Sequence, residues 1–439
     1  MANSYLNRTA VSGNSKTWTF SAWVKRSALT SGSYDTFFSA DLAVTNSVRI
    51  TFSSDSSNDK LRVYYYTGSM QMDLVTNREF RDTSAWYHIV VQVDTTQATA
   101  SNRAKIYVNG VQETSFATST YPSQNTDTSV NYVNSPHEVG RGGGNLYFNG
   151  YLSHVVLVDG TVVAPTEFGS TDSTSGIWKF KSPSGLTFGN NGFHLKFENS
   201  GNLGLDSSGE THNYTVNGNL KQSLSTPSNT YATPNPLENL RVGNTSNAPS
   251  YSNGSNTVTG SAAANHQWNC GFGISKGKWY WELKALASNP DASIGYRKQT
   301  DTSGSMQNLF GFSFANDKKR IDGALSGNAI GSTAQNDIYG MALDLDNGEM
   351  FIHRNGTYLS SGNPATRANP FITTSDGLPS EGVFGGHVYD GSVDINFGEG
   401  RFGTTAISSA GSNGNGSLFE YDVPSGYYAL NTKNINTYG

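Results

Sequence analysis

Hydrophobic and polar residues alternate along most of the first 160 positions, which is the pattern of β-strands with one buried face. Within 17–24, Trp18 and Phe20 fall on one side of a strand and Thr19 on the other, because successive residues point to opposite faces. Gly, Asn and Ser clusters separate such segments and predict a β-sandwich rather than alternating strands and helices. Further segments of this kind are 47–54, 60–68, 85–94, 104–112 and 150–160.

The same alternation returns over about 265–430, where the segment KWYWELKAL begins at Lys278. Trp279 and Trp281 share one face of this strand, and aromatic side chains bury more apolar area than any other kind. We therefore predict that they lie in a sandwich core, with a sugar-stacking platform as the alternative. Glu282 and Lys284 mark the opposite face, which we expect to be wet.

Asn-Gly pairs predict β-hairpins in both blocks, because a type I′ turn needs positive φ at both central residues. Asn347-Gly348 is expected to join two strands as a two-residue loop. Asn355-Gly356 and Asn109-Gly110 predict turns of the same kind. The two blocks thus predict two related sandwich architectures, without proving a duplicated sequence.

The middle of the chain is heterogeneous. It carries short strand-like segments, and its stretch 223–237 is rich in Pro, Ser and Thr, which is typical of an extended linker. We therefore predict an all-β chain of two sandwiches, 1–168 and 263–439, joined by a β/irregular linker region, 169–262. Domains of such size are ordinary for a chain of 439 residues.

Charge and cysteine content exclude several classes of protein. The net charge is −5, with 14% charged residues, whereas a nucleic-acid partner normally needs a basic stripe. Cys270 is the single cysteine, so neither an intrachain disulfide nor a multi-thiolate metal site is expected. The N-terminus lacks a basic region followed by an apolar run, and 18 apolar residues never occur together. We expect neither a standard export signal nor membrane insertion.

Catalytic patterns are not found. Asp344, Asp346 and Glu349 are interrupted by the Asn-Gly turn, so we interpret them as hairpin residues rather than a glycosidase carboxylate pair. Eight histidines show no zinc-binding spacing, and Cys270 is interpreted as a small buried residue. The glycines of 140–145 lack the Lys-Ser/Thr of a phosphate loop and are interpreted as a flexible loop.

Two tyrosines and one arginine are the candidate ligand-binding residues. Tyr64 and Tyr66 share a strand face, and exposed tyrosines stack well on sugar rings, with cross-strand packing as the alternative. Arg141 precedes the glycine run. No metal-ligand set is identified, and no cofactor is expected.

Residues 5–160 resemble laminin-G-like, concanavalin A-like jelly-roll domains, through the motifs TWTFSAWVK, WYHIVVQVD, IYVNG and FNGYLSHVVLVDG in family order. Some members of that family bind calcium, although no ligand set carries over to this sequence. Residues 265–430 resemble a SPRY domain, through KGKWYWELK, ASIGY, YGMALDLDNGEMFIHRNG and VDINFG. SPRY domains usually bind partners through loops, and the Trp-Tyr-Trp-Glu strand belongs to their framework.

The pairing of these two domains is similar to virion proteins of marine tailed phages. That resemblance implies a non-enzymatic tail-fibre, tail-tip or capsid-fibre protein on the virion surface, made in the host cytoplasm without a signal peptide. Its implied partners are other virion proteins and host surface glycan or protein, and a homotrimer follows from the fibre analogy alone. Alternatives are a structural decoration or connector subunit and a glycan depolymerase. Collagen-like repeats and coiled-coil heptads, which fibres often use to trimerise, are missing from the sequence.

Overall fold

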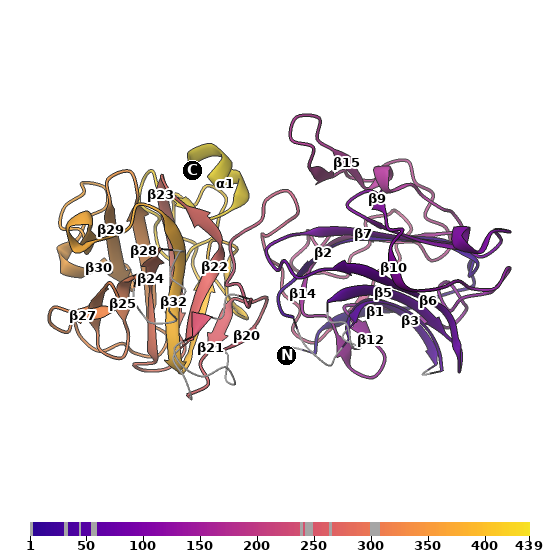
Figure 1. Cartoon of the computed structure of the whole chain (residues 1–439), viewed down its shortest axis with the longest axis horizontal. Coiled ribbons are helices and arrows are strands. Elements are labelled where there is room, and N and C mark those ends of the chain that lie inside the picture. The colour runs from indigo at the N-terminus through magenta and orange to yellow at the C-terminus, as the bar shows by residue number, and fades with distance from the viewer. Residues whose placement is uncertain are drawn as a thin grey trace. The chain divides into compact units, whose positions relative to one another are not determined.

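The computed structural model describes residues 3–29, 34–43, 45–53, 59–237, 240–241, 249–262, 266–298 and 308–439. The chain forms two compact units, Met1–Gln222 and Ser223–Gly439 (Figure 1). Regular structure in the described residues is almost entirely β-strand, in mainly antiparallel sheets, so the predicted all-β class is confirmed. The structure divides the chain into two units, whereas the sequence predicts three regions. The bounds of those three regions stay a prediction.

The larger sheet of unit 1 has the strand order β10-β6-β5-β4-β3-β11-β1-β18, with β12 and β13 attached beside β3. Its strands are β1 (Tyr5–Thr9), β3 (Asp35–Ala43), β4 (Asn46–Ser53), β5 (Lys60–Tyr66), β6 (Met70–Glu79), β10 (Phe116–Thr120), β11 (Pro136–Val139), β12 (Arg141–Gly142), β13 (Leu146–Tyr147) and β18 (Thr215–Asn217). The last strand comes from the predicted linker region, and it pairs with β1.

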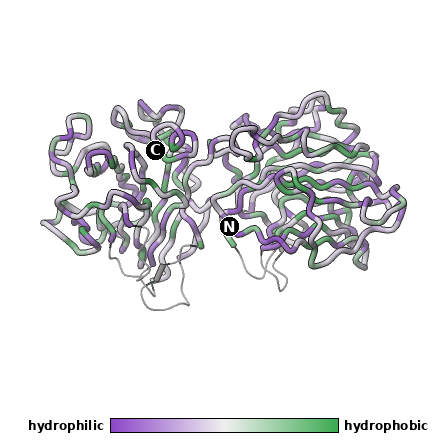
Figure 2. The backbone as a smooth tube through the Cα atoms, turned by 45° about the horizontal axis from the view of Figure 1, so that its top comes forward, coloured by the Kyte–Doolittle hydropathy of each residue, from purple (hydrophilic) through white to green (hydrophobic). Residues whose placement is uncertain are grey.

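The smaller sheet of unit 1 has the order β17-β14-β2-β7-β8-β9. Its strands are β2 (Thr17–Arg26), β7 (Tyr87–Asp94), β8 (Ala104–Val108), β9 (Val111–Gln112), β14 (Gly150–Asp159) and β17 (Phe193–Leu195). The two sheets lie face to face, as predicted for a sandwich (Figure 1). Hydrophobic and hydrophilic residues alternate along the tube of the strands (Figure 2).

The core of unit 1 fills the space between these sheets. Trp18 and Phe20 of β2 are fully buried there, and Phe20 stacks on Phe38 of β3 with ring centroids 4.6 Å apart. Ile50 and Val63 join them from the larger sheet. Burying one such side chain stabilises the fold by about 1.5–3 kcal/mol, so the alternation of β2 fixes which face turns inward.

The opposite face of β2 is also buried, which corrects the prediction of a half-buried strand. Thr19 is inaccessible because the segment after β14 folds over this face: its Oγ1 donates to Thr161 O at 2.9 Å and accepts from Val163 N at 2.9 Å. A second apolar cluster packs between this segment and the outer face of the smaller sheet. Its buried members are Val90, Val156, Val158, Val163, Phe168 and Phe188. The hairpin β15 (Gly169–Thr171) and β16 (Trp178–Phe180) continues the cover.

Unit 2 is built from two further sheets. The seven-stranded sheet contains β19 (Leu240–Arg241), β22 (His266–Ile274), β32 (Gly382–Asp390), β24 (Asp291–Arg297), β25 (Leu309–Ser313), β26 (Lys318–Ile321) and β27 (Ala324–Ser326). The nine-stranded sheet contains β20 (Ser250–Ser252), β21 (Thr257–Thr259), β33 (Ser392–Asn396), β23 (Lys278–Ala285), β28 (Ile338–Asp344), β29 (Glu349–Arg354), β30 (Thr357–Tyr358), β31 (Ile372–Thr373) and β36 (Tyr428–Ala429). The helix α1 (Thr432–Tyr438) follows.

Trp279 and Trp281 of β23 lie in the core of unit 2, as the alternation predicts. Trp281 stacks on Phe397 with centroids 5.3 Å apart. The expectation of a wet opposite face is wrong for Tyr280 and Glu282, which are both inaccessible. The C-terminal segment returns across them, and Phe419 meets the Tyr280 ring edge-on at 4.9 Å. A local pattern cannot show that a distant segment will cover a polar face.

Glu282 is a buried carboxylate that holds this returning segment. Its oxygens accept from the backbone N–H of Glu420 at 2.8 Å and of Tyr421 at 2.9 Å, and from the Tyr280 hydroxyl at 3.1 Å. Burial outweighs these hydrogen bonds and raises the pKa of Glu282 to about 7.

A raised carboxyl pKa gives a stability that is present at low pH and lost as the pH rises from about 4.5 to 7. When the pH rises from 5 to 8, we therefore expect the unfolding free energy of the parent chain to fall by about 1–3 kcal/mol more than that of the Glu282→Gln variant. Denaturant unfolding at the two pH values measures this difference. An equal effect of the substitution at both pH values would contradict the assignment.

The Asn-Gly hairpins form, but one turn differs from its prediction. In β28–β29, Asp344 pairs with Glu349, so the loop has four residues and only Gly348 of its pair has positive φ. The other two pairs are two-residue loops with positive φ at both positions, at Asn109-Gly110 and Asn355-Gly356. Asp344 stabilises the longer loop, since its carboxylate accepts from Asn347 N at 3.1 Å and from Asn347 Nδ2 at 2.8 Å.

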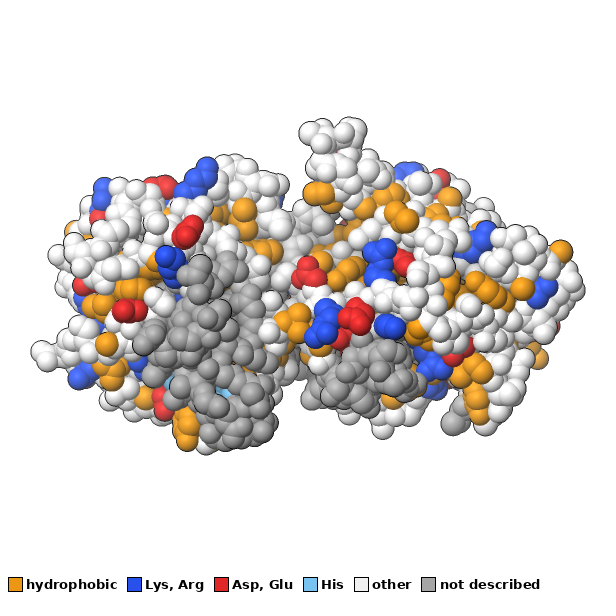
Figure 3. All heavy atoms as spheres, viewed as in Figure 1, with side chains coloured by type: hydrophobic (Ala, Val, Ile, Leu, Met, Phe, Trp, Pro, Cys, Tyr) orange, Lys and Arg blue, Asp and Glu red, His pale blue; other side chains and the backbone are white. Residues whose placement is uncertain are grey.

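Charged side chains are scattered among uncharged ones on the faces in view (Figure 3). The helices within the described residues are too short or too polar for any of them to traverse a bilayer.

Candidate functional site

A row of side chains crosses the outer face of the larger sheet of unit 1. Pairing registers place these residues opposite one another on successive strands. Each of them lies next to at least one core residue along its strand, so the row itself faces away from the core. The row runs through Asn7, Glu138, Ser39, Arg49, Tyr64 and Asp73.

Arg49 and Tyr64 form the centre of this row. The Arg49 guanidinium donates from Nη1 to the Tyr64 hydroxyl at 3.1 Å and from Nε to Asp41 Oδ1 at 3.1 Å. The other oxygen of Asp41 accepts from the backbone N–H of Gly143. Burial raises the pKa of the Tyr64 hydroxyl above its usual value, which keeps it protonated at neutral pH.

Arg62 extends the network along β5. Its Nε and Nη2 donate to the two oxygens of Asp73 at 2.8 and 3.0 Å, and its Nη1 donates to the Tyr34 hydroxyl at 3.1 Å. The guanidinium also lies 5.0 Å from the centroid of the Tyr64 ring. A bidentate pair of this kind fixes both side chains in one geometry.

Arg141 joins the same face from β12. Its Nε donates to Glu138 Oε2 at 2.8 Å, a second bond links the pair, and its guanidinium lies 3.5 Å from the Tyr5 ring centroid. Its backbone carbonyl accepts from the Ser39 hydroxyl at 3.0 Å. The glycine loop that follows therefore lies on the sheet: a side chain at Gly142 would meet Thr36 and Arg49 within 3.2 Å.

The structure brings Tyr64 and Arg141 onto one face, with different exposures from those assumed for stacking. Tyr64 exposes only 8% of its surface, because Arg49 and Arg62 lie beside its ring. Tyr66 is half-buried. The pairing of β5 with β6 shifts register just before it, so Tyr66 lies opposite Met70 and outside the row. The Arg141 side chain is 22% exposed. Ligand contact by these three residues stays a prediction.

We name Tyr5, Asp41, Arg49, Arg62, Tyr64, Asp73, Glu138 and Arg141 the arginine strip. Its guanidinium and carboxylate groups hold one another in place, so donors and acceptors sit on a rigid sheet beside aromatic rings. Such a set can bind a hydroxyl-rich or a charged polar ligand. Sequence reasoning missed Arg49, Arg62 and their acids, because alternation shows only that they point outward.

The three carboxylates of the predicted hairpin have structural contacts. Asp344 pairs with Lys278 at 2.8 Å, and Asp346 Oδ1 accepts from Gly277 N at 2.9 Å. Glu349 accepts both Arg367 hydrogen bonds, at 2.9 and 2.8 Å. Asp344 and Glu349 pair across the β28–β29 hairpin, and Asp346 lies in its loop.

Other candidate chemistry is sparse. Cys270 is buried, as predicted, and its thiol lies 3.4 Å from Phe272 O. Among the residues that the structure describes, no three His, Cys, Asp or Glu side chains gather as a metal site.

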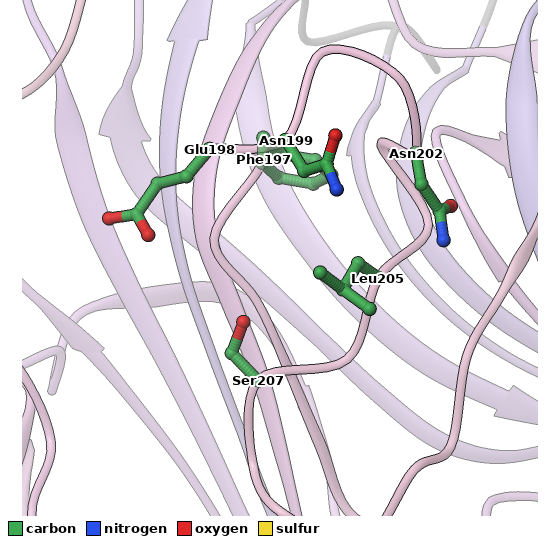
Figure 4. A pocket seen from close by; sticks show the side chains of 6 residues that line it. All are labelled: Phe197, Glu198, Asn199, Asn202, Leu205 and Ser207. Atoms are coloured by element: carbon green, nitrogen blue, oxygen red, sulfur yellow. The ribbon is translucent and has the colours of Figure 1, made fainter.

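A surface hollow of about 230 Å³ lies in the loop after β17 (Figure 4). The Glu198 side chain points away from the other lining residues in this view, and the hollow contains none of the predicted ligand residues. Its lining consists of Phe197, Glu198, Asn199, Asn202, Leu205 and Ser207.

Two mainly antiparallel sheets packed around one apolar core make unit 1 a β-sandwich. Residues 1–167 match the laminin-G family model described as "Concanavalin A-like lectin/glucanases superfamily", which confirms the laminin-G-like, concanavalin A-like resemblance of the first domain. No curated protein matches the chain.

Several solved structures are similar at low identity. The SPRY domain of human HERC1 is 13% identical with a TM-score of 0.27, over 32% of this chain and 87% of that domain. Domain 4 of AbnA, a GH43 extracellular arabinanase from Geobacillus stearothermophilus in complex with arabinotriose, is 19% identical with a TM-score of 0.27. This match covers 34% of this chain and 64% of that one. A putative carbohydrate-binding protein from Bacteroides ovatus is 14% identical with a TM-score of 0.34. This match covers 49% of this chain and 56% of that one.

Proposed function

We propose that this chain is a non-enzymatic binding protein of a phage virion surface, in a tail fibre, tail tip or capsid fibre, and that it binds host surface glycan or protein during adsorption. The observation that carries the binding part is the arginine strip, on a sandwich whose residues 1–167 match the family model of concanavalin A-like lectins and glucanases. The virion part rests on the pairing of the two domains, which resembles virion proteins of marine tailed phages over most of the chain.

The strip suits a polar ligand for two physical reasons. Paired guanidinium and carboxylate groups present fixed donors and acceptors, so little side-chain entropy remains to be lost on binding. Strip residues also reach the surface in part, since the side chains of Arg62 and Arg141 are 13% and 22% exposed. Arginine and tyrosine are also the residue types most often found to dominate binding energy.

Two arginine variants test this site. Arg62→Ala and Arg141→Ala are each expected to weaken binding of the labelled full chain to host cells by at least about tenfold, because each removes a positioned guanidinium. Arg367→Ala is the matched control, since Arg367 is an exposed, ion-paired arginine of unit 2. Saturable binding that neither strip variant weakens would place the ligand elsewhere.

A role in building the particle is distinguished by a second experiment. Virions that lack the chain are expected to assemble and stay intact while they adsorb poorly to host cells. Particles that fall apart without it, together with a purified chain that never binds cells, would favour a structural decoration or connector subunit.

A further inference from the structure

Two histidines that are 40 positions apart in the sequence meet at one edge of the smaller sheet of unit 1. His154 belongs to β14 and His194 to β17, and these strands pair antiparallel with His194 opposite Val156. His154 Nδ1 and His194 Nε2 are 3.3 Å apart. His194 is buried and His154 is half-buried, so the pair reaches the surface on one side.

The backbone at His154 is strained to achieve this meeting. Its φ is +47°, a left-handed conformation that costs a residue with a Cβ about 1 kcal/mol or more. The residue lies within a register shift between Ser153 and Val156, where β14 pairs with β2. Bulges of this kind turn a side chain in a direction that regular pairing would not allow.

Neighbouring groups hold the His154 ring and the backbone of His194 in position. Phe180 stacks on the His154 ring with centroids 3.8 Å apart and an interplanar angle of 18°. The backbone N–H of His194 donates to Asp206 Oδ1 at 2.8 Å, which fixes the strand at that point. Fixed rings lose little freedom when they bind a further group.

The two nitrogens are within reach of a long hydrogen bond, and their separation also matches that of two ligands of one metal ion. Hydrogen bonds from N–H groups normally span about 2.7–3.2 Å. Two imidazole nitrogens at about 2.0–2.1 Å from one tetrahedral zinc ion lie roughly 3.3–3.4 Å apart. Imidazole also favours zinc, copper and nickel over calcium or magnesium, which take oxygen ligands.

We propose that His154 Nδ1 and His194 Nε2 are two ligands of one Zn²⁺ ion at the surface of unit 1, with water at the remaining positions. The site is separate from the arginine strip, which lies on the other sheet. It therefore stands or falls independently of the proposed function.

Calorimetric titration of the full chain with Zn²⁺ alone at pH 7.5 tests the site. One ion is expected to bind per chain, and His154→Ala and His194→Ala are each expected to weaken that binding by at least about tenfold. His212→Ala is the matched control: His212 is a half-buried histidine of the same unit whose Nδ1 lies 2.8 Å from Gly192 O. Failure of the parent chain to bind Zn²⁺, or binding that survives both substitutions, would overturn the proposal.

A third variant should change the affinity in the opposite direction. Lys196 lies two positions after His194, and its positive charge acts on the His194 ring. A charge that repels a proton from this ring also repels a metal cation, so Lys196→Gln is expected to tighten Zn²⁺ binding. Saturating Zn²⁺ should also raise the melting temperature of the parent chain and leave His154→Gln unchanged. An equal rise in both proteins would contradict the assignment of His154.

Discussion

Replacing Arg26 with alanine is expected to lower the unfolding free energy of unit 1 by about 3–5 kcal/mol. The Arg26 guanidinium is buried at the end of β2, where it pairs with Asp35 at 3.1 Å and with Asp59 at 2.7 Å. It also donates to Phe80 O at 2.9 Å and lies 4.8 Å from the Phe52 ring centroid. Its removal takes the buried cation away from two buried carboxylates and leaves Asp59 only its more distant pair with the exposed Arg81, at 3.7 Å, which is a costly way to break such a cluster.

Denaturant unfolding of the full chain measures this loss, and hydrogen exchange of β2 assigns it to unit 1. The matched control is Lys179→Ala, because Lys179 forms an exposed ion pair with Asp172 at 2.8 Å in the same unit. That control should change the stability by less than about 1 kcal/mol. Equal effects of the two substitutions would show that burial of the Arg26 cluster is unimportant.

Acidification is expected to destabilise unit 1 through two buried histidines. His88 Nδ1 accepts from Trp178 Nε1 at 3.0 Å, and His137 Nε2 accepts from Asn131 N at 3.1 Å, so each ring is held in its neutral form. Burial lowers the pKa of both to about 3. A depressed histidine pKa gives stability that is present above about 6.5 and lost as the pH falls towards 3.

Between pH 7 and pH 5, these two rings together should lower the unfolding free energy of unit 1 by about 4 kcal/mol. Hydrogen exchange of β7 and β11 in the full chain at both pH values measures the effect. His88→Gln, which cannot be protonated in this range, should lose about 2 kcal/mol of the pH dependence, which is the share of one ring, because His154 and His194 of the same unit also have lowered pKa. Protection of these strands that is unchanged between pH 7 and pH 5 would contradict the account.

The sandwich could be predicted because alternation is a local property of each strand. Trp18 and Phe20, or Trp279 and Trp281, show their buried face directly in the sequence. What covers the other face could not be predicted, because it comes from distant segments. Glu282 is buried beneath residues near 420, and Thr19 beneath residues near 162.

The candidate site shows the same division between local and distant information. Alternation places Arg49 and Tyr64 outward on their own strands, but their hydrogen bond depends on the pairing of β4 with β5. Arg141 reaches the same face only because β11 inserts between β1 and β3. The meeting of His154 and His194 has no sequence signal at all, since it depends on a bulge and a strand pair.

Competition for adsorption is the most direct test of the central claim, that the arginine strip binds the host surface. Purified full chain is added to host cells before the phage particles that we propose carry it, and the adsorbed fraction is measured. The parent chain is predicted to block adsorption in a saturable manner, while the Arg62→Ala/Arg141→Ala double variant blocks it far less. Equal blocking by both proteins would contradict the strip as the binding site, and no blocking by either would contradict the binding function itself.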